Sequence, residues 1–202
     1  MIRIKQSSLM HTIQDLGRFG FASQGVAHAG PMDSIAACWA NWMLGNPVNS
    51  PFIEIGGGGL VAEFTKSANV AIAGAWGDFT LDGQPLIGPG CYPVNAGEVL
   101  KIGRLSSGLF TYFAVEGGFD MMPFLGSVAT CQRDALGGAD GSGNALAAGD
   151  ALSHETSQLK PLRLISRRYL ESYRAPLMCD LIMRNSDHFD STAIGHFFNQ
   201  SY

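Results

Sequence analysis

The chain has 202 residues, of which 46% are hydrophobic, enough for one substantial domain or for one domain and part of a second. Only 15% of the residues are charged, against about 25% in an average protein, and the formal net charge is −4. Apart from Arg167 and Arg168 the basic residues do not cluster, which argues against nucleic acid and anionic membranes as partners.

The N-terminus and the cysteines indicate a compartment. The first residues lack the apolar core of a secretory signal, and no apolar run reaches the roughly 18 residues that a membrane-spanning helix needs. The four cysteines are scattered without a C-x-x-C pair, which argues against a zinc site and against a disulfide framework. We therefore expect a cytoplasmic protein without a metal site.

The first quarter of the chain is predicted to hold one strand, one irregular loop and the clearest helix. Met1–Ser8 is the expected strand, and His11–Gly30 reads as a loop rich in glycine and polar residues. Asp33 or Ser34 can cap the helix, and Gly45–Pro47 ends it. We expect one apolar helix face to be buried as core. Its members, at helical spacing, are Ile35, Cys38, Trp39, Trp42 and Met43.

From residue 51 to residue 115 the pattern is typical of short β-strands. Asp82–Gly83 supplies the residues that a type I′ hairpin turn prefers. Leu109–Val115 is apolar at both alternating positions, which predicts a central strand covered on both faces. Short strands with regular turn signals favour a barrel or a sandwich. The expected strands are Pro51–Ile55, Leu60–Phe64, Asn69–Ala73, Phe79–Leu81, Tyr92–Val94, Val99–Ile102 and Leu109–Val115.

The last third of the chain contains the expected domain boundary. Gly137–Gly149 reads as a loop, and His154–Pro161 is a polar connector. Beyond it, Pro176–Met183 is predicted to be a strand and Asp187–Phe198 a helix. This order of strand and then helix repeats the opening of the chain and hints at a second lobe built like the first.

Several catalytic and nucleotide-binding motifs are absent from the sequence. There is no G-x-x-x-x-G-K-[ST] phosphate loop, no G-x-S-x-G nucleophile turn and no H-E-x-x-H zinc motif. The glycine pairs at Gly56 and Gly58 and at Gly141 and Gly143 lack the third glycine of a dinucleotide fingerprint. The individual motifs therefore predict a mostly β domain without assigning it a reaction.

An ordered series of shorter motifs carries a resemblance over residues 12–150. The segments are Thr12–Gly20, Ala29–Asp33, Leu44–Pro47, Ile53–Ile55, Ala71–Ala75, Ala96–Leu100, Ala114–Gly118, Leu125–Ser127 and Ala148–Asp150. Each is weak alone, but their order resembles the signature of the bacterial allophanate hydrolase subunit 2 family, also called the biotin-dependent carboxyltransferase or 5-oxoprolinase C-subunit family. Gly141–Asn144 departs from the shorter Gly-Arg turn of many members.

The resemblance implies a mainly β fold, a cyclophilin-like β-barrel lobe with one or two helices, followed by the start of a second similar lobe. We expect the first lobe to span residues 1–155 and the connector and incomplete second lobe to span residues 156–202. Members of the family are longer than this chain. Apolar residues after Leu159 would then pack back on the first lobe or mediate a homodimer.

The family also implies a function within a complex. The first expectation is a non-autonomous subunit of an ATP-dependent hydrolase acting on an amide or lactam, namely 5-oxoprolinase, which converts 5-oxoproline to glutamate. Its partners would be an allophanate hydrolase subunit 1-like protein and a separate catalytic subunit, and ATP would be used by the complex without necessarily being bound by this chain. The alternatives are a regulatory protein that antagonises a kinase inhibitor, or the carboxyltransferase part of a biotin-dependent urea carboxylase system.

Three candidate site residues share the loop after residue 12. Gln14, Asp15 and Arg18 lie within five residues and are rich in hydrogen-bonding groups. Arg18 can clamp a carboxylate or carboxyphosphate through two parallel hydrogen bonds. The alternative is a buried network that staples the loop, with Asp15 and Arg18 paired. We expect Asp15 to be catalytic, and Gln14 and Arg18 to bind substrate.

Further candidates lie outside that loop. Glu54 is a lone acid in an apolar strand, where burial raises the pKa of an unpaired carboxyl; it is a candidate acid or base, or else a partner for Arg18. Asn41 lies inside the helix, where asparagine is unfavourable, so it needs a polar contact to the first loop or a ligand.

The remaining expected substrate contacts are Gly117, Gly118 and Arg133. The two glycines allow close approach of the backbone to a ligand or to another strand. Arg133 faces an anionic substrate under the functional interpretation and solvent under the structural one.

Overall fold

The computed structural model describes residues 1–154, Ile165 and Thr192. The chain divides into two compact units, Met1–Ile165 and Ser166–Tyr202. The strand and helix expected after residue 176, and the association expected of that segment, lie outside the described residues. The predicted division into lobes at residue 155 stays a prediction.

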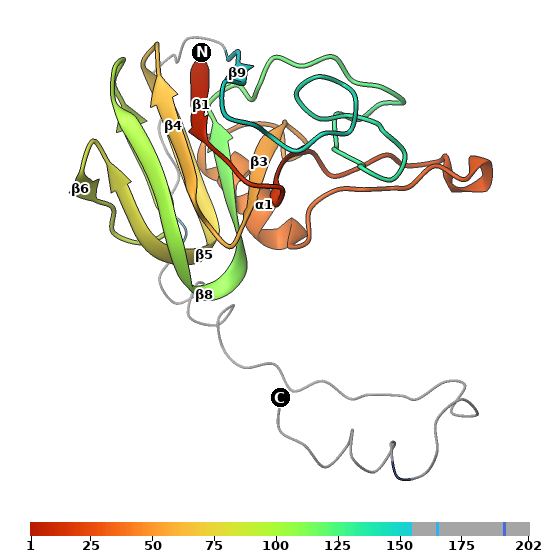
Figure 1. Cartoon of the computed structure of the whole chain (residues 1–202), viewed down its shortest axis with the longest axis horizontal. Helices are drawn as coiled ribbons and strands as arrows, with labels where there is room; N and C mark the ends of the chain where they lie inside the picture. The colour runs from red at the N-terminus through yellow and green to blue at the C-terminus, as the bar shows by residue number, and fades with distance from the viewer. Residues whose placement is uncertain (155–164, 166–191, 193–202) are drawn as a thin grey trace. The chain divides into compact units, whose positions relative to one another are not determined.

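The described part is mainly β, as expected, with one α-helix, α1 (Ser34–Met43), and one short 3-10 helix, η1 (Ala22–Gln24). Figure 1 shows a curled sheet with long loops to one side of it. The strands are β1 (Ile2–Gln6), β2 (His11–Gln14), β3 (Phe52–Gly56), β4 (Leu60–Phe64), β5 (Ala68–Leu81), β6 (Gln84–Pro85), β7 (Gly90–Val94), β8 (Val99–Val115) and β9 (Ala151–Leu152). No helix among the described residues is long and apolar enough to cross a membrane.

Strand β8 organises the sheet. The strand order is β2-β3-β8-β4-β1-β9, and β5 pairs with β8 and also with β6 and β7. One half of β8 pairs with β4 and the other half with β3, while β5 follows it along most of its length. The two long strands bend together, which gives the sheet its curl (Figure 1).

The expected lengths of two strands were wrong. Asn69–Ala73 and Phe79–Leu81 belong to one strand, β5, and Val99–Ile102 and Leu109–Val115 belong to β8. The β5–β8 ladder shifts register at three places between Gly74 and Phe79, so the pairing continues through residues that look like a break. Bulges absorb such irregular residues without ending a strand.

Two hydrophobic cores lie on the two faces of the sheet. Along β8, Phe113 and Val115 belong to the larger core, whereas Tyr112 and Ala114 belong to the core under α1. This alternation follows from successive side chains of a strand pointing to opposite faces. The second half of β8 is therefore covered on both faces, as predicted, although Leu109 is 54% exposed.

The helix begins and ends where the sequence predicts, but it buries a different face. Asp33 is the N-cap, and its carboxylate accepts a hydrogen bond from the N–H of Ala36 at 3.0 Å. Gly45 follows with a φ of 73°. The prediction that the tryptophan face is buried was only partly right: Met43 is 1% exposed and Trp39 packs against the core, but Ile35 is 51% and Trp42 41% exposed.

Small side chains explain which helix face is buried. Ala36, Ala37 and Ala40 pack against a sheet face that is itself lined by Ala71 and Ala73. Alanines on both surfaces let the helix lie close to the sheet, and the larger Trp39 packs at the edge of this core. Spacing alone does not distinguish a face of small residues from one of large residues.

The turn prediction and one loop prediction were confirmed, but the predicted loop His11–Gly30 was wrong at its start, because His11–Gln14 is strand β2 and pairs with β3. Asp82 and Gly83 both have positive φ, 47° and 79°, as a type I′ turn between β5 and β6 requires. Residues 137–149 form no regular element, as expected. The loops of residues 15–33 and 116–150 lie on the same side of the sheet (Figure 1) and hold most of the candidate site residues.

Candidate functional site

The register of three strands brings Glu54 to the start of α1. Glu54 of β3 lies opposite Thr12 of β2 on one side and Tyr112 of β8 on the other. These residues form one row across the sheet, on the face that α1 covers. Asp33, the helix N-cap, is held above this row because its backbone N–H donates to the hydroxyl of Tyr112 at 2.7 Å.

Glu54 is held through one carboxylate oxygen. Its Oε2 accepts hydrogen bonds from the backbone N–H of Met32 at 2.7 Å and from the hydroxyl of Tyr112 at 2.8 Å. Its Oε1 accepts no hydrogen bond from any described residue, yet it is not one of the fully buried polar atoms that lack a partner. One oxygen is thus anchored, and the other is left open to solvent or to a ligand.

Burial raises the pKa of both Glu54 and Tyr112. Glu54 is only 6% exposed, and desolvation raises the pKa of its carboxyl, although the hydrogen bonds from Met32 and Tyr112 act in the opposite direction. Burial, together with the charge of Glu54, raises the pKa of Tyr112 well above its usual range. The tyrosine therefore stays a hydrogen-bond donor to Glu54. We call Glu54, Tyr112, Met32 and Asp33 the Glu54 cluster.

Sequence reasoning missed Tyr112. The available signal was a tyrosine in an apolar strand, because a buried tyrosine hydroxyl usually has a hydrogen-bond partner. Finding that partner required the register between β3 and β8, which the spacing of residues along the chain does not give. The proposed pairing of Glu54 with Arg18 was wrong, since Glu54 bonds to Met32 and Tyr112 instead.

Asp15 lies in a second polar cluster, where both of its oxygens are engaged. Oδ1 accepts from the backbone N–H of Gly17 at 2.9 Å and from the hydroxyl of Ser127 at 2.6 Å. Oδ2 accepts from the backbone N–H of Val128 at 2.8 Å. Asp15 is 3% exposed. Its carboxylate joins the loop after β2 to the segment around Ser127, and its predicted catalytic role has no support in this geometry.

Arg18 binds the same segment from its other side. Its Nε donates to the carbonyl of Phe124 at 3.3 Å, and its Nη2 donates to the carbonyls of Ser127 at 3.5 Å and Ala129 at 2.7 Å. The guanidinium is 2% exposed, and no described residue accepts a hydrogen bond from its buried Nη1. The expected two-point clamp on a substrate anion is therefore not available.

Asp15 and Arg18 form a buried loop network, as one of the two interpretations proposed, but they are not paired with each other. No ion pair joins Asp15 to Arg18 within the described part of the chain. Each side chain binds the backbone or hydroxyl groups around Ser127 instead. We call Asp15, Arg18 and residues 124–129 the Ser127 staple.

Gln14 also connects loops. Its Nε2 donates to Oγ1 of Thr12 at 3.0 Å and to the carbonyl of Thr130 at 3.3 Å, and its Oε1 accepts from the N–H of Gly30 at 3.2 Å. It is 5% exposed. The amide thus ties three segments together at the end of β2, and its predicted contact with a substrate stays a prediction.

Asn41 holds the connection after α1, and its predicted contact with a substrate stays a prediction. It is fully buried, and its Nδ2 donates to the carbonyls of Val48 at 3.2 Å and Ser50 at 2.7 Å. Its Oδ1 accepts from Nδ2 of Asn46 at 3.0 Å. Asn41 therefore fixes the connection from α1 to β3, and neither the first loop nor a ligand is needed to explain it.

Gly117 and Gly118 form the turn after β8, with φ values of 82° and 78°. A Cβ on Gly118 would lie 3.2 Å from the Cβ of Ser50, which is tighter than ordinary contact. The N–H of Gly117 donates to Oδ1 of Asn46 at 2.9 Å. These glycines therefore approach the α1–β3 connection closely, and their predicted contact with a substrate stays a prediction.

Arg133 lies on the surface, with 69% of its side chain exposed, in an ion pair with Asp134 at 2.7 Å. Its Nη2 also donates to the carbonyl of Gly25 at 3.2 Å. Asp134 in turn accepts from the N–H of Ala27 at 2.7 Å. These bonds from Arg133 and Ala27 lower the pKa of Asp134 to about 2. The pair fastens the loop around η1, and a substrate role for Arg133 stays a prediction.

No group of three or more histidine, cysteine, aspartate or glutamate side chains in the described residues is arranged to hold a metal ion. His11, which is fully buried, bonds through Nε2 to the carbonyl of Gly58 at 3.0 Å. Burial lowers the pKa of His11.

The two carboxylates among the predicted site residues differ: both oxygens of Asp15 accept hydrogen bonds, whereas Glu54 keeps one open oxygen.

Comparisons with known proteins give a consistent assignment. The carboxyltransferase domain, subdomains A and B, matches residues 24–202. The chain is 40% identical over 152 residues to the C-subunit of 5-oxoprolinase from Haemophilus influenzae, covering 75% of this chain and 48% of that protein. It is 38% identical over 144 residues to urea amidolyase of Saccharomyces cerevisiae, covering 70% of this chain and 8% of that protein.

Solved structures agree with the sequence relatives. A crystal structure of Kluyveromyces lactis urea carboxylase superposes with a TM-score of 0.79 at 26% identity, covering 98% of this chain and 19% of that one. The chain spans about half the length of the 5-oxoprolinase C-subunits that it matches, which are those of Haemophilus influenzae and Escherichia coli. The resemblance carried by the motifs from Thr12 to Asp150 is confirmed, and the chain belongs to the carboxyltransferase domain family.

Proposed function

We propose that this chain is a subunit of a bacterial, cytoplasmic complex that opens 5-oxoproline to glutamate at the expense of ATP. The complex would contain an allophanate hydrolase subunit 1-like protein and a separate catalytic subunit. The proposal is supported by the 40% identity to the 5-oxoprolinase C-subunit. One structural observation carries it, namely the open oxygen of a buried glutamate, Glu54.

The chemistry of lactam opening suits such a carboxyl. Water adds to the lactam carbonyl, the carbon–nitrogen bond breaks, and the nitrogen takes up a proton. A carboxyl with a raised pKa keeps its proton at a higher pH than a solvated one does, so it can serve as a general acid or, once ionised, as a base. The pKa of Glu54 is raised by burial. Met32 and Tyr112 fix its Oε2, so its Oε1 is free to exchange a proton with the substrate.

The start of α1, beside Glu54, does not suit the phosphates of ATP. A phosphate chain needs N–H donors or cations, which a helix start often supplies. At the start of α1 the N–H of Ala36 already donates to Asp33, and the N–H of Met32 already donates to Glu54. Two carboxylates at this position would repel phosphate. We therefore assign the use of ATP to another subunit.

The test is reconstitution with the subunit 1 relative and the separate catalytic subunit, followed by ATP-dependent glutamate release. Glu54→Gln removes the titrating group and keeps its shape, and we expect activity to fall by about 100-fold or more, the usual contribution of general acid–base catalysis. Glu63→Gln is the matched control, since Glu63 pairs with Lys5 on the surface at 3.4 Å. Glutamate release that does not depend on this chain would overturn the proposal.

A second candidate is favoured by the urea carboxylase structure, whose similarity covers 98% of this chain. Under that alternative the chain takes part in carboxyl transfer from biotin to urea. The Glu54 cluster leaves no free donor for the ureido carbonyl of biotin, because the N–H groups of Met32 and Asp33 are both used. Transfer of carboxyl from a carboxylated biotin carrier to urea, dependent on this chain, would support this alternative.

The regulatory alternative makes a different prediction in the same experiment. A protein that only binds the subunit 1 relative would form a tight complex, and neither Glu54→Gln nor Glu63→Gln would change glutamate release. Comparing complex formation, glutamate release and carboxyl transfer to urea for the same two variants thus separates the three functions.

A further inference from the structure

One edge of the sheet is left partly unpaired at β9. Its inner edge pairs with β1, with Ile2 opposite Leu152 and Arg3 opposite Ala151. Because backbone groups of an antiparallel strand alternate between its two sides, Leu152 bonds to β1, and the N–H and C=O of Ala151 point outward. The N–H of Ile4 donates to the carbonyl of Asp150 at 2.8 Å, which agrees with this alternation.

The outer edge of β9 begins to pair and then stops. The N–H of Asp120 donates to the carbonyl of Ser153 at 2.9 Å, next to a bridge between Phe119 and His154. The next pair in this register would join Met122 to Ala151. Met122 is instead 92% exposed, and no described residue pairs with the outward N–H and C=O of Ala151. The segments that contain Met122 and Ala151 therefore diverge beyond the contact between Asp120 and Ser153. We call the gap between these two diverging segments the fork.

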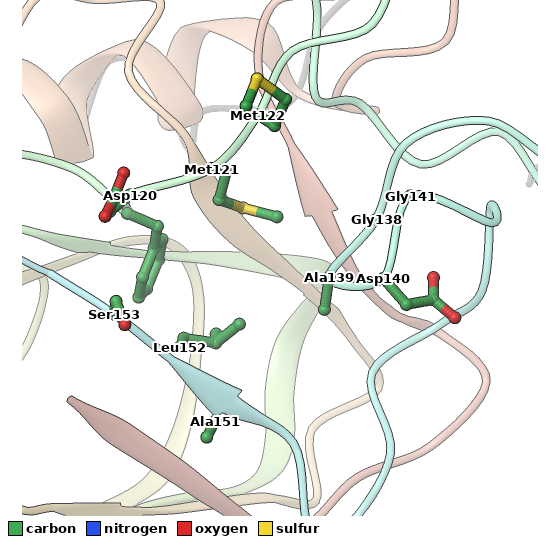
Figure 2. Close-up of a pocket in the computed structure, with 11 residues that line it drawn as sticks. Asp120, Met121, Met122, Gly138, Ala139, Asp140, Gly141, Ala151, Leu152 and Ser153 are labelled. Atoms are coloured by element: carbon green, nitrogen blue, oxygen red, sulfur yellow. The ribbon is translucent and has the colours of Figure 1, made fainter.

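The fork encloses a cavity of about 320 Å³. In Figure 2, Leu152 of β9 lies on one side, Met121 extends from the other segment, and Ala139 faces them from the loop of residues 138–141. This volume is at the lower end of the roughly 300–1,000 Å³ of ordinary ligand sites. It suits a short occupant with a small apolar side chain.

The rim of the cavity is acidic. Asp120 and Asp140 lie on opposite sides of it (Figure 2), and no lysine or arginine is among its lining residues. A neighbouring cavity of about 360 Å³ shares Asp140 and adds Asp150, again without a basic residue in its lining. Arg3 lies across the ladder from Ala151, on the β1 side, and lines neither cavity.

We propose that the fork beside β9 binds a short extended segment of a partner protein as an added strand. The outward N–H and C=O of Ala151 would pair with its backbone, as in other complexes formed by strand addition. The acidic rim selects a segment that carries lysine or arginine, and the cavity takes its small apolar side chain against Met121, Ala139 and Leu152. This site is separate from the Glu54 cluster and does not depend on the reaction proposed there.

The test uses the full chain labelled with ¹⁵N and the acetylated and amidated peptide Lys-Val-Lys-Val as probe. We expect the amide signals of Ala151 and Ser153 to shift and the hydrogen exchange of Ala151 to slow by about tenfold or more. Two matched peptides serve as controls, namely Glu-Val-Glu-Val and a Lys-Val-Lys-Val that is N-methylated at alternate residues. Both should bind at least about tenfold more weakly, because one is repelled by the rim and the other cannot pair.

Two variants check the location. Ala139→Trp fills the cavity and should abolish the shifts at Ala151. Asp120→Asn keeps the shape and should weaken binding of the basic peptide several-fold, with a smaller effect at high salt. Equal binding of the N-methylated peptide, equal binding of the acidic peptide, or no shift at Ala151 with any probe would each overturn the proposal.

Discussion

Two buried carboxylates of this protein, Glu54 and Asp15, differ in how many of their oxygens are engaged. Glu54 is 6% and Asp15 3% exposed, so their burial is nearly the same. Asp15 accepts three hydrogen bonds through both oxygens, whereas Glu54 accepts two through Oε2 alone. Burial alone therefore does not mark a functional carboxylate. The difference lies in the open oxygen, because a carboxylate oxygen that accepts no hydrogen bond is available to a substrate, whereas both oxygens of Asp15 already have partners.

The clusters around the two carboxylates differ in the same way. The Ser127 staple connects two loops through backbone carbonyls and N–H groups, and Arg18 belongs wholly to it. The Glu54 cluster connects a helix start to the middle of the sheet through Tyr112. We expect changes in the staple to lower stability, and changes in the cluster to alter proton binding and activity.

The largest expected loss of stability comes from Arg18→Ala. The change removes the donor of the Ala129 carbonyl and leaves a cavity in place of a fully buried side chain, and an unsatisfied buried group alone costs about 1–3 kcal/mol. The carbonyls of Phe124 and Ser127 each lose one of two donors, since each also accepts from the N–H of the other residue. We expect the free energy of unfolding to fall by about 3 kcal/mol or more, measured by urea denaturation. The matched control Arg133→Ala should change it by no more than about 0.5 kcal/mol. Equal effects of the two changes would show that Arg18 is no staple.

A smaller loss is expected from Tyr112→Phe. The change removes the donor to Glu54 and the acceptor for the N–H of Asp33, at a cost of about 1–3 kcal/mol in unfolding free energy. Because the tyrosine hydrogen bond lowers the pKa of Glu54, its loss should raise that pKa further. A ¹³C titration of the Glu54 carboxyl measures this. A fall in the pKa would contradict the assigned role of Tyr112.

The pH dependence of stability follows from the raised pKa of Glu54. The folded state holds the proton more tightly than the unfolded state, whose pKa is near the ordinary 4.5. The stabilisation is therefore complete below that value and is lost as the pH rises through the folded-state pKa. Across this range the wild type should lose stability relative to Glu54→Gln, as urea unfolding at several pH values would reveal. A difference that runs the other way would mean a lowered pKa.

The smallest effect is expected at the exposed pair of Arg133 and Asp134. The bonds from Arg133 and Ala27 lower the pKa of Asp134 from about 3.8 to about 2. Their stabilisation is present above pH 3.8 and is lost as the pH falls through about 2. In Arg133→Ala the pKa of Asp134 should rise towards its ordinary value, as a carboxyl titration followed by NMR can show. An unchanged pKa would mean that Ala27 alone sets it.

The sequence predicts local structure better than it predicts partners. The helix from the Asp33 cap to Gly45, the Asp82–Gly83 hairpin and the fully covered end of β8 depend on neighbouring residues, and each was confirmed. The continuity of β5 and β8 was missed, because bulges carry the ladder past Gly74 and Gly77. The buried face of α1 was predicted only in part, because its spacing fits both the alanines and the tryptophans.

For the candidate site, too, the sequence indicates which residues matter but not which residues they contact. Composition identified Glu54, Asp15 and Arg18 as polar residues that need an explanation, but not which atoms they contact. Their partners come from distant parts of the chain, Tyr112 for Glu54 and the segment around Ser127 for Asp15 and Arg18. Such contacts depend on strand register and loop packing, which the order of residues alone does not display.

The central claim, that Glu54 acts chemically while Asp15 acts structurally, is tested most directly by comparing Glu54→Gln with Asp15→Asn. Both changes remove a buried carboxylate and keep its shape. For each variant we would measure urea unfolding and, in the reconstituted complex, ATP-dependent glutamate release per folded subunit. We predict that Glu54→Gln retains its stability near neutral pH and loses activity, whereas Asp15→Asn loses about 1–3 kcal/mol of stability and retains activity per folded subunit. A Glu54→Gln variant with full activity, or an Asp15→Asn variant that is stable and inactive, would contradict the claim.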